Sequence, residues 1–299
     1  MKTVHWKGMA KNMKKKKWEH SIWIAGMTVA SLIMMIPIIM MFSTSFKTME
    51  EIKSPVFHLL PEHFSLVNYQ NAMSNGNWLI YFRNSICITG TAVVFSLLFN
   101  SIAGYAFARL KFRGSRIMFI LLMVGLMMPP QVTMLPTFLI LAKFPLMGGN
   151  NLLGAGGTGL VNTYAGLVIP LISGSYGVFM CKQFYENFPR SLDEAAEIDG
   201  AGKWRTYFMI YLPNSKAILA TLGLLKAVAV WNDYMWPLVM TNSESMKTVQ
   251  LALTMFKTES GVQWNQMMAA AVLAALPMFV LFLCAQKYFI QGIVTSGLK

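Results

Sequence analysis

The chain of 299 residues carries little charge. Asp, Glu, Lys and Arg together make up only 12% of it, about half the usual share of a soluble domain. Among the charged residues the acidic ones are fewer, with 12 against 25 basic ones. Apolar residues reach 55%, and the mean hydropathy is +0.49. This composition excludes an ordinary soluble domain and predicts a membrane protein.

Several motifs that support catalysis are missing from the sequence. No G-x4-G-K-[ST] motif occurs, so this chain should not hydrolyse ATP itself. The four histidines, His5, His20, His58 and His63, all lie outside the apolar runs, so we expect solvated surface positions rather than metal ligands. No serine within an apolar run has a histidine partner in the same run. We therefore expect no enzyme, and neither a metal nor a cofactor bound by this chain.

Cysteine is also scarce. Cys87, Cys181 and Cys284 each lie in or at the edge of an apolar run, without CxxC spacing. We expect them to be small buried hydrophobic side chains, rather than members of a disulfide or a metal site.

The excess of positive charge is concentrated at the N-terminus. Seven lysines precede Trp18, ahead of the first apolar run and without the aromatic interleaving of a nucleic-acid site. We expect no nucleic-acid partner. Residues 1–20 are predicted to form a basic cytosolic segment that attracts anionic lipid of the bilayer, and residues 21–299 to form the membrane domain.

Long apolar runs define the expected fold class. A bilayer core requires about 20 apolar residues per helix. Six runs qualify, at 21–43, 84–107, 117–141, 164–181, 217–240 and 267–289. The sequence therefore predicts an all-α integral membrane protein with six transmembrane helices.

Two of these runs need interpretation. The first run exceeds the 7–15 residues typical of a signal-peptide core, so we interpret it as an uncleaved anchor. The third is interrupted by Pro129 and Pro130, which cannot both continue a regular helix. That interruption either lines a pathway or ends the span early.

Lysine and arginine gather on one side of the predicted spans. The N-terminus and the loops after the second and fourth spans carry most of them. By the positive-inside rule both termini are cytosolic, and residues 191–213 form a cytosolic loop between spans four and five.

The segment 191–213 is polar and has helix signals. Ser191 and Glu194 have capping-box spacing, which predicts a helix start. Gly200 is a typical helix end, and a second helical stretch then runs to Pro213.

This short helix has a small-residue face. Ala195 and Ala196 are strong helix formers that let a partner approach the backbone, and Glu194 and Asp199 place charge beside them. The pattern alone is compatible with a docking element for a cytosolic partner or with a solvated surface helix.

The same segment resembles the EAA loop of ABC-importer permeases, E-A-A-x3-G-x9-I-x-L-P. The matching residues are Glu194, Ala195, Ala196, Gly200, Ile210, Leu212 and Pro213. The resemblance implies a type I importer fold in which this loop is the coupling helix, with Asp199 beside it, seated in a cleft of an ATP-hydrolysing subunit. We call residues 191–213 the EAA segment.

The likeness extends over most of the chain. Residues 84–114 resemble the second span of that family, and residues 231–240 resemble the fifth span of its carbohydrate branch. The stretch from Leu276 onward resembles the last span and tail of the smaller permease of maltose-type importers. The resemblance implies a second related permease, two cytosolic ATPases that bind ATP and Mg²⁺, and an extracytoplasmic solute-binding protein. The location would be the cytoplasmic membrane of a prokaryote. The substrate would be a carbohydrate, with an oligosaccharide ahead of a monosaccharide, a polyol or glycerol 3-phosphate.

Polar and aromatic residues near the end of the fifth run are candidates for a substrate path. They are Trp231, Asn232, Asp233 and Trp236. Asp233 is costly inside a span, so it either faces a polar cavity or packs structurally at a helix break near Pro237. Asn100 and Gln131 are further candidates for lining the path.

Other functions are less consistent with the sequence. A secondary transporter would show an internal repeat and several deep charges, and neither is evident. "GAGGTG" at 154–159 fits G-x-G-x-x-G but lacks the strand that such a phosphate site needs. We interpret it as part of an external loop that meets the solute-binding protein.

Overall fold

The computed structural model describes the backbone of residues 2–259 and 261–296, and the side chains of residues 18, 20–259 and 261–286. The chain divides into two compact units. Unit 1 comprises Met1–Asn75 and Phe256–Leu273, and unit 2 comprises Gly76–Met255 and Ala274–Lys299. Each unit is described by itself.

Unit 1 is held together by a buried amide. It contains α1 (Lys2–Phe46), α2 (Met49–Lys53), α3 (Val67–Ser74), the hairpin of β1 (Lys257–Thr258) and β2 (Gly261–Val262), and the first part of α14 (Trp264–Ser296). The Asn68 side chain donates to the carbonyls of Ser45 (2.9 Å) and Lys47 (2.8 Å) and accepts from Asn265 (2.8 Å). One side chain therefore joins the end of α1, α3 and α14.

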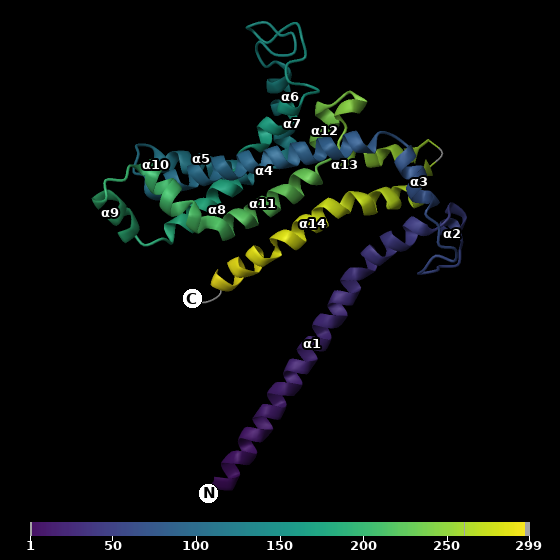
Figure 1. Ribbon diagram of the computed structural model, residues 1–299, viewed down its shortest axis with the longest axis horizontal. Coiled ribbons are helices and arrows are strands. Elements are labelled where there is room, and N and C mark those ends of the chain that lie inside the picture. The colour runs from purple at the N-terminus through teal and green to yellow at the C-terminus, as the bar shows by residue number, and fades with distance from the viewer. Residues whose placement is uncertain (1, 260, 297–299) are drawn as a thin grey trace. The chain divides into compact units, whose positions relative to one another are not determined.

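Unit 2 is a helical bundle centred on α4. Its elements are α4 (Trp78–Arg109), α5 (Ser115–Met127), α6 (Pro130–Ala142), α7 (Tyr164–Val168), α8 (Ser175–Glu186), α9 (Ser191–Ile198), α10 (Lys203–Thr206), α11 (Lys216–Trp231), α12 (Met235–Met240), α13 (Val249–Ala252) and the later part of α14. The helices α8 and α11 run along α4, and α9 lies at one end of the unit (Figure 1).

Small residues allow α4 and α8 to approach closely. A Cβ added at Gly104 would overlap the Cβ of Cys181, and one at Gly177 would overlap the Asn100 side chain. Asn100 in turn accepts from the Gly174 N–H (3.0 Å), where α8 begins. Contacts of this kind let packing and hydrogen bonds, rather than the hydrophobic effect, hold helices together in lipid.

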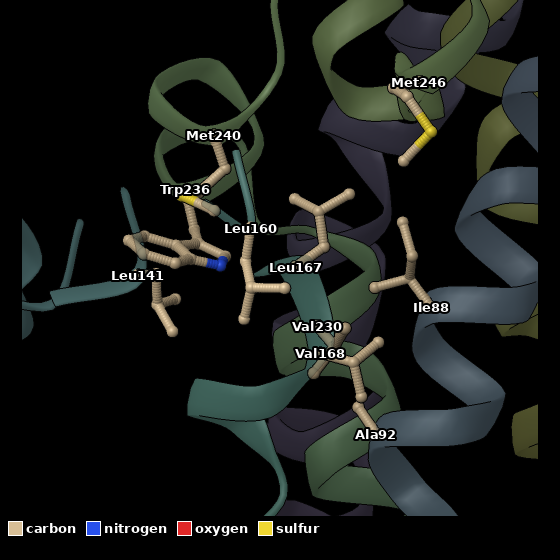
Figure 2. Packing of buried hydrophobic residues seen from close by; sticks show 10 residues of the cluster. All are labelled: Ile88, Ala92, Leu141, Leu160, Leu167, Val168, Val230, Trp236, Met240 and Met246. Carbon is tan, nitrogen blue, oxygen red and sulfur yellow. The ribbon is translucent and has the colours of Figure 1, made fainter. Parts of the chain in front are cut away.

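An apolar cluster fills the space between α4, α7, α11 and α12. Ile88 and Ala92 of α4 meet Leu167 and Val168 of α7, and the Trp236 indole of α12 packs in the same cluster (Figure 2). The side chains shown there are 9% exposed or less.

The number of membrane-length helices agrees with the predicted fold class. In the described residues, His20–Phe46, Trp78–Arg109 and Trp264–Gln286 are each long and apolar enough to cross a membrane. Three further spans arise if each bent helix pair counts as one, which gives up to six. The predicted interruption at Pro129 and Pro130 is confirmed: α5 ends at Met127, and α6 starts at Pro130 at an angle of 108°.

The prediction for the fifth span, 217–240, is correct at its start and wrong at its end. The helix α11 starts at Lys216. A bent pair, Lys203–Tyr211 and Pro213–Trp231, forms the fifth candidate span, with an angle of 42° at the break. Pro213 starts a new turn because its fixed φ suits a first helical position. The far end stops at Trp231, and residues 232–234 turn before α12.

The cysteine prediction is correct for one residue out of three. Cys181 is buried between α4 and α8, whereas Cys87 and Cys284 are exposed on apolar helices. Helix faces that meet lipid are as apolar as a core, so sequence alone does not separate the two locations.

Two glycine substitutions in α4 test the close approach of α4 and α8. Gly104→Ala should lower stability by about 1–3 kcal/mol, because the added methyl group overpacks a backbone contact. Gly90→Ala is the matched control, since no atom lies within 4 Å of its added Cβ. The thermal midpoint of each purified variant in detergent measures the difference. Equal midpoints would contradict the packing described here.

Candidate functional site

The helix α9 carries the first half of the EAA segment. It begins at Ser191 as expected, but not by the expected capping box: Arg190 occupies the N-cap position, and no side chain caps the helix. The N–H groups of Asp193 and Glu194 donate to the Arg190 carbonyl (2.9 and 3.1 Å). The turn at Pro189 therefore starts the helix one residue earlier than a Ser191 cap would.

The end of α9 agrees with the prediction. Gly200 has φ of 69°, in the left-handed region that favours glycine. Its N–H donates to the Glu197 carbonyl (3.1 Å), and the Ala201 N–H donates to the Ala196 carbonyl (2.8 Å). These two bonds form a Schellman motif, which closes the helix and turns the chain.

The two faces of α9 differ in character. Ala196 is only 4% exposed and packs inward, whereas Ala195 is exposed. Ile198 is 87% exposed, and no atom lies within 4 Å of a Cβ added at Gly200. The outer surface is therefore small and partly apolar. Ile198 was not among the expected site residues, although an isoleucine between two acidic residues of a polar loop is a visible signal.

Charge and hydrogen bonds fix the inner side of α9. The Arg109 Nη1 lies 3.2 Å from the Asp193 Oδ2, and the Tyr211 hydroxyl donates to the Asp193 Oδ1 (2.8 Å). Arg109 also donates to the carbonyls of Tyr185 and Phe188 at the end of α8. Sequence reasoning missed this cluster, because its members are far apart along the chain.

A second group of hydrogen bonds lies deeper in the bundle. The Ser101 hydroxyl is 2.6 Å from the Tyr185 hydroxyl and accepts from the Tyr207 hydroxyl (2.8 Å). The Tyr105 ring packs at 5.3 Å from the Tyr207 ring and 4.9 Å from the Tyr211 ring. The helix that leaves the EAA segment is therefore attached to α4 by both polar and aromatic contacts.

The second half of the EAA segment forms a bend. Tyr207–Tyr211 is a π-helical turn, and the Leu212 N–H donates to the Tyr207 carbonyl (2.9 Å). Ile210 and Leu212 are partly buried against the aromatic residues of this region, and Pro213 opens the next turn. Ile210, Leu212 and Pro213 thus link α9 to α11.

A polar hollow of about 890 Å³ adjoins α9. It is lined by the end of α4, the following basic residues Lys111 and Arg113, and acidic residues including Glu194. Lys203 pairs with Glu197 on the exposed side, and this ammonium group lowers the pKa of the Glu197 carboxyl. The hollow offers both signs of charge to an incoming surface.

The candidate path residues near the end of α11 lie on both sides of the turn at 232–234 and face different neighbours. The buried Trp231 Nε1 donates to the Ala274 carbonyl of α14 (3.0 Å). Asn232 is exposed, donates to the Val228 carbonyl (2.9 Å) and accepts from Gln250 (2.8 Å).

Asp233 and Trp236 lie at the start of α12. The Asp233 Oδ1 accepts from the Trp236 N–H (3.2 Å), and both residues line a small cavity together with Thr89. The Thr89 hydroxyl and the Trp236 Nε1 are buried without a hydrogen-bond partner among the described residues. Asn100 and Gln131 lie elsewhere, the first between α4 and α8 and the second exposed in the first turn of α6.

The segment "GAGGTG" lies in the loop between α6 and α7. A helix and not a strand precedes it, so the phosphate-binding arrangement of G-x-G-x-x-G is not formed. Asn150 organises the loop instead, donating to the carbonyls of Ala142 (2.9 Å) and Phe144 (3.0 Å) and accepting from Gly157 (2.8 Å).

The fold is that of a multi-pass membrane protein whose bundle presents a short, closed helix on a charged loop. Residues 96–295 match the profile of the family described as "binding-protein-dependent transport system inner membrane component". The chain belongs to this family.

Relatives match over nearly the whole chain. It is 31% identical over 292 residues to the arabinooligosaccharides transport system permease protein AraQ of Halalkalibacterium halodurans, covering 96% of this chain and 100% of the relative. It is 31% identical over 271 residues to the probable starch degradation products transport system permease protein AmyC of Thermoanaerobacterium thermosulfurigenes, covering 91% and 94%.

The fold is also similar to a solved structure. A chain of a bacterial ABC transporter involved in the import of the acidic polysaccharide alginate aligns with a TM-score of 0.75 and 23% identity. The alignment covers 90% of this chain and 95% of that chain. At this identity the likeness establishes the shared fold.

Family membership decides between the transporter hypotheses. The chain is the permease component of a binding-protein-dependent ABC importer in the inner membrane, so it depends on a binding protein. ATP is hydrolysed by a partner ATPase and not by this chain. A secondary transporter without an ATPase is thereby excluded.

Proposed function

We propose that this permease imports a carbohydrate, and specifically an oligosaccharide, by alternating access. The observation that supports this substrate class is the full-length similarity to permeases named for arabinooligosaccharides and for starch degradation products. ATP and Mg²⁺ act at the partner ATPase, and closure of the ATPase pair drives the change of access.

The EAA segment is proposed as the coupling element. Its outer face combines the small residues Ala195 and Gly200 with the exposed Ile198, a shape that fits a cleft of the ATPase. The proposed coupling residues are Glu194, Ala195, Ala196, Asp199, Gly200, Ile210, Leu212 and Pro213. The first five lie on or directly after α9, and the last three form the bend into α11.

The assembly is proposed to contain a second related permease, two cytosolic ATPases and an extracytoplasmic solute-binding protein. Both termini are cytosolic, because the lysines of residues 1–20 and the basic loops after α4 and α8 belong on the inner side. Residues 21–299 form the permease domain. The loop between α6 and α7 then faces outward, where a binding protein can reach it.

The substrate path is proposed to pass the turn at 232–234. Asn232 and Asp233 supply amide and carboxylate groups, and Trp231 and Trp236 supply aromatic surface. Asn100 and Gln131 remain further candidates. The unpaired Thr89 hydroxyl and Trp236 Nε1 beside Asp233 support a polar function for this region, since buried polar groups normally have partners.

Affinity purification tests the assembly. The tagged chain, extracted in mild detergent, should co-purify with a cytosolic ATPase and a second six-span permease, and the complex should hydrolyse ATP. The associated binding protein should bind oligosaccharides in a calorimetric screen. A binding protein specific for glycerol 3-phosphate would overturn the substrate class, and a lone chain would overturn the assembly.

The docking surface is tested by Gly200→Asp. This change adds bulk and charge and forces an aspartate into the left-handed region, so uptake should be abolished while membrane insertion is kept. Gly202→Asp is the matched control, because Gly202 has φ of −68° and open space around it. Normal uptake by Gly200→Asp would mean that α9 is not the coupling element.

The path is tested by Asp233→Asn. Asparagine keeps an acceptor for the Trp236 N–H but loses the charge, so uptake should fall by about tenfold if the carboxylate bonds to substrate hydroxyls. Co-purification of the ATPase should be unchanged. Loss of the folded protein would instead assign Asp233 a structural role at the start of α12.

A further inference from the structure

We propose that Arg109, Asp193 and Tyr211 form a clamp that makes α9 move as one body with α4 and α11. The clamp transmits force from the ATPase to the membrane helices and contacts neither substrate nor nucleotide. The inference rests on the proposed function of α9 as the coupling element. All three are positioning residues.

Arg109 is the centre of the clamp. Its side chain is only 7% exposed, although it is the last residue of α4. The Nε and Nη2 atoms donate to the Tyr185 carbonyl (3.1 and 2.6 Å), Nη2 also donates to the Phe188 carbonyl, and Nη1 reaches Asp193. The planar guanidinium therefore joins α4, the end of α8 and α9. A lysine cannot make this set of bonds from one ammonium group.

Asp193 connects the same helix to the next span. One carboxylate oxygen is bonded to Arg109, and the other accepts from the Tyr211 hydroxyl (2.8 Å). The Arg109 guanidinium carbon also lies 5.4 Å from the centre of the Tyr211 ring. Charge-assisted bonds in a partly buried site are stronger and more directional than exposed ones.

The other acidic residues of α9 make no such connection. Glu194 is exposed, and the Glu197–Lys203 pair is exposed and contained within the EAA segment. Exposed pairs of this kind contribute little. Among the charged side chains described on α9, Asp193 is the one that bonds both to α4 and to the π-helical turn before α11.

A second group of hydrogen bonds, deeper in the bundle, supports the same conclusion. Ser101 of α4 bonds to the hydroxyl groups of Tyr185 and Tyr207, so α4 and α8 are also joined to the π-helical turn. A displacement of α9 is therefore passed to helices already connected beneath it, and not absorbed in a loose loop.

The coupling ratio of the assembled transporter tests the clamp. Tyr211→Phe removes one hydroxyl, and Asp193→Asn removes the charge. In liposomes with the loaded binding protein, each should lower the substrate imported per ATP hydrolysed by about tenfold, while the ATPase still co-purifies. Glu62→Gln is the matched control, because it breaks the exposed His58–Glu62 pair outside the EAA segment, and it should keep the wild-type ratio.

Two further variants separate coupling from structure. Arg109→Lys keeps the positive charge but should still lower the substrate imported per ATP, because an ammonium group cannot make the same set of bonds. The double variant of Tyr211→Phe and Asp193→Asn should lower this ratio no more than the larger of the two single changes, because both disrupt the same clamp. Import and ATP hydrolysis falling together at an unchanged ratio would overturn the clamp. A wild-type ratio in Tyr211→Phe and Asp193→Asn would also overturn it.

If the variants fail to fold, a distance measurement on the otherwise unchanged chain tests the clamp instead. Spin labels at the exposed positions Lys111 and Glu197 report the distance between the end of α4 and α9. This distance should be the same without nucleotide and in an ATP-trapped complex. A change between the two states overturns the clamp. A wild-type chain that binds no ATPase overturns the proposed function instead, so the two failures are distinguishable.

Discussion

A helix that stops inside a bilayer must satisfy its backbone groups from within the protein, because lipid offers no hydrogen bonds. Buried polar side chains meet this requirement at several breaks in unit 2. Asn100 accepts from the N–H of Gly174, and Asp233 accepts from the N–H of Trp236. Asn84 donates to the carbonyls of Ser245 and Lys247 (2.8 Å each) in the segment before α13. In this apolar chain, these polar residues thus lie where one helix ends and the next begins.

The same requirement shapes the connection to α9. At the end of α8 the Tyr185 carbonyl accepts from the Phe188 N–H (3.2 Å), and Arg109 donates further bonds to this carbonyl and to the Phe188 carbonyl with one side chain. The Nη1 atom of the same guanidinium then bonds to the Asp193 carboxylate. A group that completes a helix end also fixes the loop that follows it, so the bundle and the EAA segment form one connected structure.

Local signals predicted much of this structure, and long-range contacts account for the rest. The break at Pro129 and Pro130 and the helix end at Gly200 depend on the conformations of those residues, so the sequence predicts them correctly. The end of α11 depends on a turn at 232–234 that tertiary contacts stabilise, and the predicted span ran past it. Sequence analysis did not single out Arg109, because its partners lie 76 or more positions away. The capping box failed because an earlier turn at Pro189 already supplies the start.

The Schellman end at Gly200 has a consequence for how the complex assembles. The C-terminal end of α9 is closed by backbone bonds, and its inner side is fixed by Asp193 through bonds within its own chain. In the proposed docking of α9, the ATPase meets a preorganised element and does not have to fold one. Binding then loses little conformational entropy, and more of the contact energy of the outer face is available for affinity. A permease inserted alone in the membrane already displays its binding surface in final form, so the order in which the subunits are synthesised need not matter.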